Sequence, residues 1–277
     1  MVRRAAVLGR PIQHSLSPVL HRAAYAALGL DWAYAAIDCG VAELATVLAD
    51  RSDWAGFSCT MPLKHAALDL ADDVSALASL VGAANTLLPR PGGGWLADNT
   101  DVAGIVAALG GEQVGTRRVT VLGAGGTAQA VLVALAQVNV SSCAVLVRDP
   151  SRAAAAITTA ATAGVRAEIG ALTPHAPQLD ADLVVSTLPP GAADPLAARA
   201  WTSGQTLLDV VYAPWPTAIA AAVEAAGGVV ISGAQMLLHQ AAAQVELMTG
   251  RVAPVEAMRT ALFNEVGRGD AGRVRGG

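Results

Sequence analysis

The chain has 277 residues, a length that favours two compact lobes over one. Hydrophobic residues make up 53% of the chain and charged residues only 14%, which excludes an intrinsically disordered protein. A net charge of −4 without a run of Lys or Arg excludes a nucleic-acid partner and favours a small molecule. Polar residues interrupt the apolar stretches at 119–140 and 217–238, so we expect no membrane contact and a cytoplasmic location.

The first hundred residues alternate short apolar runs with helical patterns. Strands are predicted at Ala5–Leu8, Trp32–Ile37, Gly56–Cys59 and Asn85–Leu88. Helices are predicted at Pro18–Leu28, at Val41–Ala49, from Pro62 and at Thr100–Leu109, and a Gly-rich hairpin at Pro91–Gly94. Cys39, Cys59 and Cys143 lie far apart without CxxC spacing, so each is interpreted as a small buried side chain, and neither a disulfide nor a metal site is predicted.

A second series begins after a polar, Gly-containing link near Gly110–Thr116. It has predicted strands at 119–122, 144–147, 183–186, 206–211 and 228–231, and helices at 127–136, 151–163 and 217–226. Two late helical segments, Gly233–Gly250 and Pro254–Val266, have no strands of their own, so we expect them to pack on the first lobe. The alternation predicts an α/β fold with two α/β domains and mostly parallel sheets.

The strand at Val119–Leu122 runs into a glycine-rich turn that opens a helix. This is the G-x-G-x-x-A form of the dinucleotide-binding fingerprint, formed by Gly123, Ala124, Gly125, Gly126, Thr127 and Ala128. Gly123 permits the tight turn, Gly125 lets a pyrophosphate approach the backbone, and Ala128 keeps helix and strand close. The free N–H groups of the helix N-terminus favour the phosphates. We therefore predict nucleotide binding rather than a turn that binds nothing.

The next strand ends at Val147, where such folds bind the ribose of the cofactor. Arg148 and Arg152 can converge on the 2′-phosphate of NADP, which favours NADP. Asp149 can instead hold the ribose diol of NAD, or serve as the N-cap of the helix that begins at Pro150.

Four polar clusters interrupt the apolar background of the first lobe. The first contains Ser15 and Ser17, whose hydroxyls can both donate to a carboxylate, although Ser17 is also a natural N-cap before Pro18. The second contains Lys64, the only lysine of the chain, placed early in a helix whose N-terminal dipole favours the neutral amine. The third surrounds Asn85, and the fourth contains Asp101, which can pair with Lys64 or simply occupy the first turn of a helix.

These clusters and the later motifs, in this order, resemble the shikimate dehydrogenase family over nearly the whole chain. The motifs are Pro11–Pro18 with His21, Thr60–Lys64, Ala84–Thr86, Asp98–Asp101 with Gly104, Ser186-Thr187 with Pro189 and Gly191, Asp209–Tyr212 with Pro214 and Thr217, and Gly233–Leu237 with Gln240. The family fold implies a substrate-binding domain at 1–104 plus 233–266 and a Rossmann-type NADP-binding domain at 105–232. The five glycines and mixed charges of 267–277 predict a disordered tail.

The resemblance also implies residue roles. Ser15 and Ser17 would hold the substrate carboxylate, and Lys64 and Asp101 would be the catalytic pair. The reaction would require no metal. The ring hydroxyls would be bound by Thr60, Asn85, Asp101 and Gln240, with Tyr212 nearby. Further contacts to the cofactor NADP would come from Thr187, Val210, Gly233 and Met236. The implied reaction is the reversible NADPH-dependent reduction of 3-dehydroshikimate to shikimate, in the pathway to the aromatic amino acids.

Three departures from the family pattern bear on this prediction. Ser58 replaces the usual Asn, Cys59 replaces a common Val, and Asp149 follows Arg148 where the family usually has Thr. Asp149 keeps an NAD-linked quinate/shikimate dehydrogenase as an alternative. A non-catalytic metabolite sensor is disfavoured because Lys64 and Asp101 are both present. A homodimer is compatible with the sequence.

Overall fold

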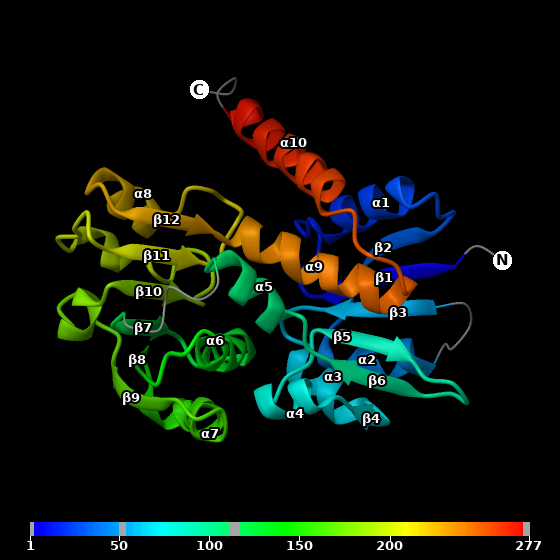
Figure 1. The fold of residues 1–277 in the computed structure, drawn as a ribbon, viewed down its shortest axis with the longest axis horizontal. Coiled ribbons are helices and arrows are strands. Elements are labelled where there is room, and N and C mark those ends of the chain that lie inside the picture. The colour runs from blue at the N-terminus through cyan, green and yellow to red at the C-terminus, as the bar shows by residue number, and fades with distance from the viewer. Residues whose placement is uncertain (1–2, 50–53, 111–116, 274–277) are drawn as a thin grey trace. The chain divides into compact units, whose positions relative to one another are not determined.

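The structure is a computed structural model that describes residues 3–49, 54–110 and 117–273. The chain forms two compact units, each built around its own six-stranded sheet (Figure 1). The first unit comprises Met1–Ser79, Ala83–Thr100 and Leu237–Gly277, and the second comprises Leu80–Gly82 and Asp101–Met236. The chain therefore passes from the first unit to the second at Asp101 and returns after Met236. These crossings lie a few residues from the boundaries predicted after 104 and 232. Most of the predicted link at Gly110–Thr116 lies outside the described residues.

The sheet of the first unit is mixed, with strand order β2-β1-β3-β5-β6-β4. Its strands are β1 (Arg4–Gly9), β2 (Ala33–Asp38), β3 (Trp54–Cys59), β4 (Asp73–Val74), β5 (Thr86–Pro89) and β6 (Trp95–Asp98). β1 pairs in parallel with β2 and β3, whereas β5 is antiparallel to both β3 and β6. The predicted hairpin at Pro91–Gly94 connects β5 to β6, which explains the reversal of direction.

Helices cover both faces of this sheet. They are α1 (Ser17–Ala27), α2 (Val41–Ala49), α3 (Lys64–Leu70), α4 (Ala76–Val81), α9 (Gly233–Thr249) and α10 (Val255–Arg273). Because side chains alternate along a strand, Leu8 of β1 packs with α2 and α3, whereas its neighbour Val7 packs with Tyr25 of α1 and Met248 of α9. Helix α10 packs against α1, and α9 from Leu237 onward lies in the first unit, whereas its first turn lies in the second.

The second unit has a fully parallel sheet with strand order β12-β11-β10-β7-β8-β9. Its strands are β7 (Val119–Leu122), β8 (Ser142–Val147), β9 (Arg166–Ala171), β10 (Leu183–Ser186), β11 (Thr206–Asp209) and β12 (Val229–Ser232). In chain order this is the 3-2-1-4-5-6 arrangement of the doubly wound dinucleotide-binding fold. Its order reverses at β7, which pairs with β8 on one side and β10 on the other.

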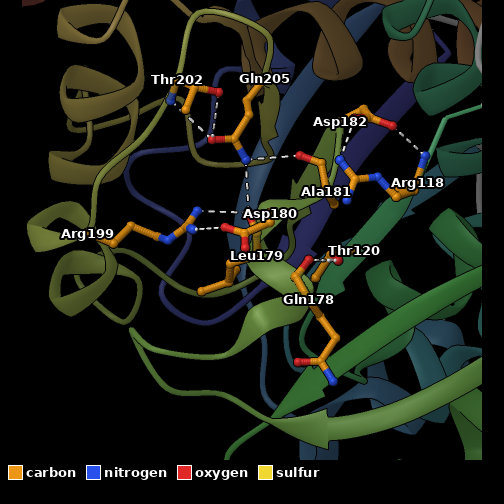
Figure 2. Close-up of polar contacts among 10 residues, drawn as sticks. All are labelled: Arg118, Thr120, Gln178, Leu179, Asp180, Ala181, Asp182, Arg199, Thr202 and Gln205. Carbon is orange, nitrogen blue, oxygen red and sulfur yellow. Dashed lines mark hydrogen bonds and ion pairs between the residues drawn. The ribbon is translucent and has the colours of Figure 1, made fainter.

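The helices of the second unit are α5 (Asp101–Ala108), α6 (Gly126–Gln137), α7 (Ala154–Thr162) and α8 (Ala218–Ala225), with short 3-10 helices η2 (Pro150–Ala153), η3 (Pro177–Asp180) and η4 (Asp194–Ala198). α8, η3 and η4 pack on one face of the sheet around Leu122 and Leu207. Polar contacts hold the η3 connection (Figure 2): Gln205 Nε2 donates to the carbonyl oxygens of Leu179 and Ala181 at 2.9 Å each. These bonds hold the short η3 crossover against the sheet without a full helix.

Most predicted elements are confirmed within a residue or two, but no range was predicted for β4, α4, β6, β9, η3 or η4. Of these, β9 is an edge strand whose side chains alternate between exposed and half-buried without an apolar run. Helix α10 continues to Arg273, so residues 267–273 are helical where the sequence predicts a disordered tail, and 274–277 lie outside the described residues. All three cysteines are buried, as predicted. Among the described residues, no helix is both long and apolar enough to cross a membrane.

Candidate active site

The topology of the first sheet gathers the four predicted polar clusters at one edge. β1 and β3 are parallel, so their last residues, Gly9 and Cys59, end at the same edge. β5 is antiparallel to β3, which places Asn85, the residue before β5, at that edge too. β6 reverses once more, and its last residue, Asp98, pairs with Thr86. Segments far apart in the sequence therefore meet at one place.

Backbone hydrogen bonds fix the second cluster between its neighbours. Thr60 N donates to Leu8 O at 2.9 Å, and Arg10 N donates to Met61 O at 3.0 Å, which ties this loop to the start of the Ser15–Ser17 loop. Lys64 is the first residue of α3 and is half-buried. Its carbonyl oxygen accepts from Ala84 N at 2.8 Å, which joins it to the Asn85 segment.

In the first cluster, Ser17 does not occupy the N-cap position of α1 that the sequence offered as one alternative. Ser17 is the first residue of α1 and is buried, and the N-cap position is occupied by Leu16, without a side-chain cap. The hydroxyl of Ser15 instead accepts from Ser17 N at 3.3 Å. The N-cap interpretation of Ser17 is therefore wrong, because the helix begins one residue earlier than a Ser17 cap requires.

Asn85 is the centre of the polar groups at this edge and is 2% exposed. Its Oδ1 accepts from Thr86 Oγ1 and from Thr100 N, both at 2.8 Å. Its Nδ2 donates to Thr100 Oγ1 at 2.9 Å and to Gln240 Oε1 at 3.3 Å. The structure thus brings the side chains of Asn85 and Gln240 within hydrogen-bond distance of each other. The bonds to Thr100 fix the position of the residue that directly precedes Asp101.

Two further side chains, those of Gln244 and Ser58, support Asn85 from behind. Gln244 of α9 donates from Nε2 to Asn85 O at 3.1 Å and to Thr86 Oγ1 at 2.9 Å. Ser58 donates to Gln244 Oε1 at 2.7 Å and is 2.6 Å from the Tyr34 hydroxyl. Only the position of Gln244 one helical turn after Gln240 hints at this role, because both then lie on the same side of α9.

In the second unit, the predicted nucleotide turn has the geometry that the fingerprint requires. Gly123 has φ of +102°, and a Cβ there would lie 2.7 Å from Thr187 Oγ1. Gly125 is the N-cap of α6, and a Cβ there would meet no atom within 4 Å. A substituent at Gly125 would thus project into open space beside the N–H groups of the helix N-terminus, where a phosphate can approach.

The end of β8 supports one of the alternatives for Asp149. Asp149 is the N-cap of η2: its Oδ1 accepts from Ser151 N at 3.0 Å and from Ser151 Oγ at 2.7 Å. These bonds from Ser151 hold the pKa of the Asp149 carboxyl below its usual value. Arg148 and Arg152 on either side are exposed. The acidic residue is thus committed to its own turn, and the two guanidinium groups face solvent.

Two of the residues predicted near the cofactor, Gly233 and Val210, are in close contact. A Cβ on Gly233 would lie 2.1 Å from Val210 O, so the first residue of α9 must be glycine for the backbones to approach. Val210 N in turn donates to Ser186 O at 3.0 Å, next to Thr187. The ends of β10 and β11 and the start of α9 therefore form one continuous surface beside the Gly123 turn.

Comparison with known proteins agrees with this architecture. Residues 7–87 match the family described as shikimate dehydrogenase substrate binding domain, and residues 233–263 match the shikimate 5'-dehydrogenase C-terminal domain. Residues 119–243 match a saccharopine dehydrogenase NADP binding domain. The NADP(+)-dependent shikimate dehydrogenase of Moorella thermoacetica is 36% identical, over 98% of this chain and 96% of that protein.

This chain belongs to the shikimate dehydrogenase family. Among solved structures, the shikimate dehydrogenase of Mycobacterium tuberculosis is 48% identical with a TM-score of 0.85, covering 95% of this chain and 99% of that one. That of Thermus thermophilus, in complex with NADP(H) and shikimate, is 34% identical with a TM-score of 0.82, covering the same shares. The likeness therefore extends over both units.

The family's site residues are divided between the two units of this chain. Ser15, Ser17, Thr60, Lys64, Asn85 and Gln240 belong to the first unit; Asp101, Tyr212, Met236 and the nucleotide turn belong to the second. Within each unit, the residues meet at the carboxyl ends of the parallel strands, the edge at which open α/β sheets bind ligands.

Proposed function

We propose that this chain is an NADP-dependent shikimate dehydrogenase that catalyses the reversible reduction of 3-dehydroshikimate to shikimate. One observation carries the proposal: the four polar clusters of the first sheet, far apart in the sequence, converge at a single edge. Full-length similarity to proteins of that name supports it. The cytoplasmic location and the homodimer stay predictions from the sequence.

In the first unit, we assign the substrate contacts as the family pattern implies. The hydroxyls of Ser15 and Ser17 donate to the carboxylate of the substrate. The ring hydroxyls are bound by Thr60, Asn85, Asp101 and Gln240, with Tyr212 near the ring. Asn85 and Gln240 are hydrogen-bonded to each other at 3.3 Å, so both amides lie within reach of one ligand, which would replace that bond.

In the second unit, the residues of the nucleotide turn, Gly123 to Ala128, fit the pyrophosphate of NADP. The open space beside Gly125 and the free N–H groups of α6 suit a doubly charged group. Arg148 and Arg152 suit the 2′-phosphate, because Asp149 is held by Ser151. Gly233 and Met236 border the nicotinamide, and Thr187 and Val210 make further contacts to the cofactor. The cofactor supplies a hydride when it is bound.

Lys64 and Asp101 perform the proton chemistry of the reaction. The Lys64 ammonium protonates the carbonyl oxygen during reduction, and the neutral amine takes the proton back during oxidation. Asp101 is the catalytic partner that the family pattern assigns to Lys64. Its position depends on Thr100, the preceding residue, whose backbone N–H is held by Asn85 Oδ1. No other lysine is available for this role, because Lys64 is the only one.

Steady-state kinetics test both parts of the proposal. We expect turnover with shikimate and NADP to exceed turnover with quinate, or with NAD, in a four-way comparison. Lys64→Ala should lower kcat by about 10²–10⁴-fold at neutral pH, the usual contribution of a positioned acid–base group. His65→Ala, which removes the exposed neighbour, is the matched control. Higher kcat/KM with quinate and NAD would instead support the quinate-linked alternative, and an active Lys64→Ala would remove Lys64 from the mechanism.

A further inference from the structure

A buried polar network lies behind Asn85, on the face of the first sheet that α1 and α9 cover. It contains His21 of α1, Tyr34 of β2, Ser58 of β3 and Gln244 of α9. All four side chains are buried, Ser58 at 4% exposure and Gln244 at 1%. Polar groups are costly to bury unless each has a partner, so the pairing pattern in this network is tightly constrained.

The hydrogen-bond directions at one end of Gln244 follow from the available donors. Ser58 gives its only hydrogen to Gln244 Oε1, so the Tyr34 hydroxyl, 2.6 Å away, must donate to Ser58 Oγ. His21 is neutral because burial lowers its pKa to about 3. With Nε2–H donating to Gln244 Oε1 at 3.3 Å, His21 Nδ1 accepts from the Tyr25 hydroxyl at 3.4 Å. Two donors therefore face the carbonyl oxygen of Gln244.

The opposite end of Gln244 is thereby committed to donating. Its Nε2 gives one hydrogen to Asn85 O and the other to Thr86 Oγ1. Thr86 must then direct its own hydrogen to Asn85 Oδ1, at 2.8 Å. This leaves only one orientation for the Asn85 amide, with Oδ1 toward Thr86 and Nδ2 toward Gln240.

We propose that Ser58, Gln244 and Thr86 are positioning residues that fix the Asn85 amide in its substrate-binding orientation before the substrate arrives. This rests on the proposed function, since it assigns Asn85 to a ring hydroxyl. Ser58 consequently acts through Gln244 rather than on the substrate: its hydrogen is given to Gln244, and its oxygen accepts from Tyr34. Ser58, which replaces the family's usual Asn, thus has both its hydrogen and its oxygen paired within the network, the oxygen with the Tyr34 hydroxyl.

Thr86→Val tests the last step of the network with little change of shape. It removes the donor to Asn85 Oδ1 and the acceptor for Gln244, but leaves the Thr100 N bond to Asn85. We expect KM for shikimate to rise about tenfold, with kcat changed less than about threefold and KM for NADP unchanged, the pattern of lost binding in ground and transition states alike. Thr86→Ser, which keeps the hydroxyl, should restore KM.

Thr120→Val is the matched control. Thr120 in the second unit is equally buried, and its hydroxyl donates to Gln178 O. A purely structural loss of one buried hydroxyl should lower the melting temperature in both variants and leave KM for shikimate unchanged in both. That result for Thr86→Val would overturn the proposal.

A double-mutant cycle tests whether Ser58 acts through the same network. Ser58→Ala alone should raise KM for shikimate about threefold, and Ser58→Ala with Thr86→Val should raise it no further than Thr86→Val alone. Fully additive effects would instead make Ser58 an independent substrate ligand and overturn its assignment. If Thr86→Val does not fold, Gln244→Met takes its place in the cycle, with the same expectations.

The wild-type protein separates the two proposals. If it does not oxidise shikimate with NADP, the proposed function fails, and the positioning proposal fails with it. If the wild type is active and Thr86→Val keeps its KM, the positioning proposal alone is overturned.

Discussion

A single buried histidine should give this protein a measurable acid sensitivity. Burial lowers the pKa of His21 from 6.5 to about 3, so between these values the unfolded chain binds a proton that the folded chain does not. The free energy of unfolding should then fall as the pH drops from about 6.5 toward 3, with a slope of up to about 1.4 kcal/mol per pH unit from this group.

Urea unfolding of the wild type and His21→Gln at a series of pH values between 7 and 4 checks this slope. Glutamine keeps a donor for Gln244 but does not titrate, so the variant should lose that part of the slope. His14→Gln, at an exposed position, should keep the wild-type slope. Equal slopes in His21→Gln and the wild type would show that His21 is not held neutral by burial.

Asp149 should influence cofactor affinity through its charge alone. Asp149→Asn keeps an acceptor for Ser151 N and removes a negative charge next to Arg148 and Arg152. We expect KM for NADP to fall about two- to fivefold, more at low salt, and KM for NAD to change little, because only NADP carries the 2′-phosphate. Asp149→Ala, which also removes the N-cap, should in addition lower the melting temperature. A gain with NAD that equals the gain with NADP would contradict this account.

At the level of single residues, the sequence identifies the residues proposed to bind the substrate better than the residues that hold them in place. Lys64, Asn85 and Asp101 could be singled out because each belongs to a local motif whose spacing is visible in the sequence. The link between Ser58 and Gln244 could not be predicted, because it joins residues 186 positions apart. Local patterns carry no information about such a pair. The N-cap role of Asp149 was foreseen as one alternative, since capping depends on adjacent residues.

Among the elements, the glycine-rich turn before α6 makes the most specific prediction. Gly125→Ala should fold normally, because its φ is −80° and a Cβ there meets no atom of the protein within 4 Å. The added methyl group should nevertheless obstruct the pyrophosphate and raise KM for NADP at least about tenfold. Thermal unfolding without cofactor, together with KM for both substrates, checks this.

Gly123→Ala is the contrasting variant of the same turn. It should destabilise the protein even without NADP, since its φ of +102° disfavours any side chain and Thr187 lies in the way. If Gly125→Ala bound NADP as well as the wild type, the turn would not be the pyrophosphate site.

Element type could be predicted where an apolar run sets the period. Val119–Leu122, Leu183–Ser186 and Val41–Ala49 agree with the structure to the residue. β9 was missed because Arg166, Glu168 and Gly170 leave it without a continuous apolar run, as suits a strand at the edge of its sheet. The mixed sheet of the first unit also differs from a simple βα alternation, since β5 and β6 form a hairpin.

For the whole molecule, division into two units predicts separate responses to the two ligands. At about 100 times its Kd, NADP should stabilise the state that binds it by about 2.7 kcal/mol. Amide hydrogen exchange should then slow mainly in β7, β8, β10 and β11 of the second unit. Shikimate should slow exchange mainly in β3, β5 and the part of α9 around Gln240, in the first unit. Protection by NADP confined to the first unit would contradict the assignment of the nucleotide turn.

The order in which the chain is made gives the late helix α9 a further importance. β3 and β5 are synthesised early, but Gln244, the partner of Asn85 O and Thr86, lies 158 residues after Thr86. Until α9 leaves the ribosome, these polar groups and the apolar surface around Val7 and Tyr25 lack the cover that Met248 and Gln244 supply. The second unit, in contrast, is nearly contiguous, from Asp101 to Met236, and can be completed first. During synthesis, the substrate-binding half should thus be the last to mature, and a nascent chain halted before α9 should be sensitive to protease in residues 54–98.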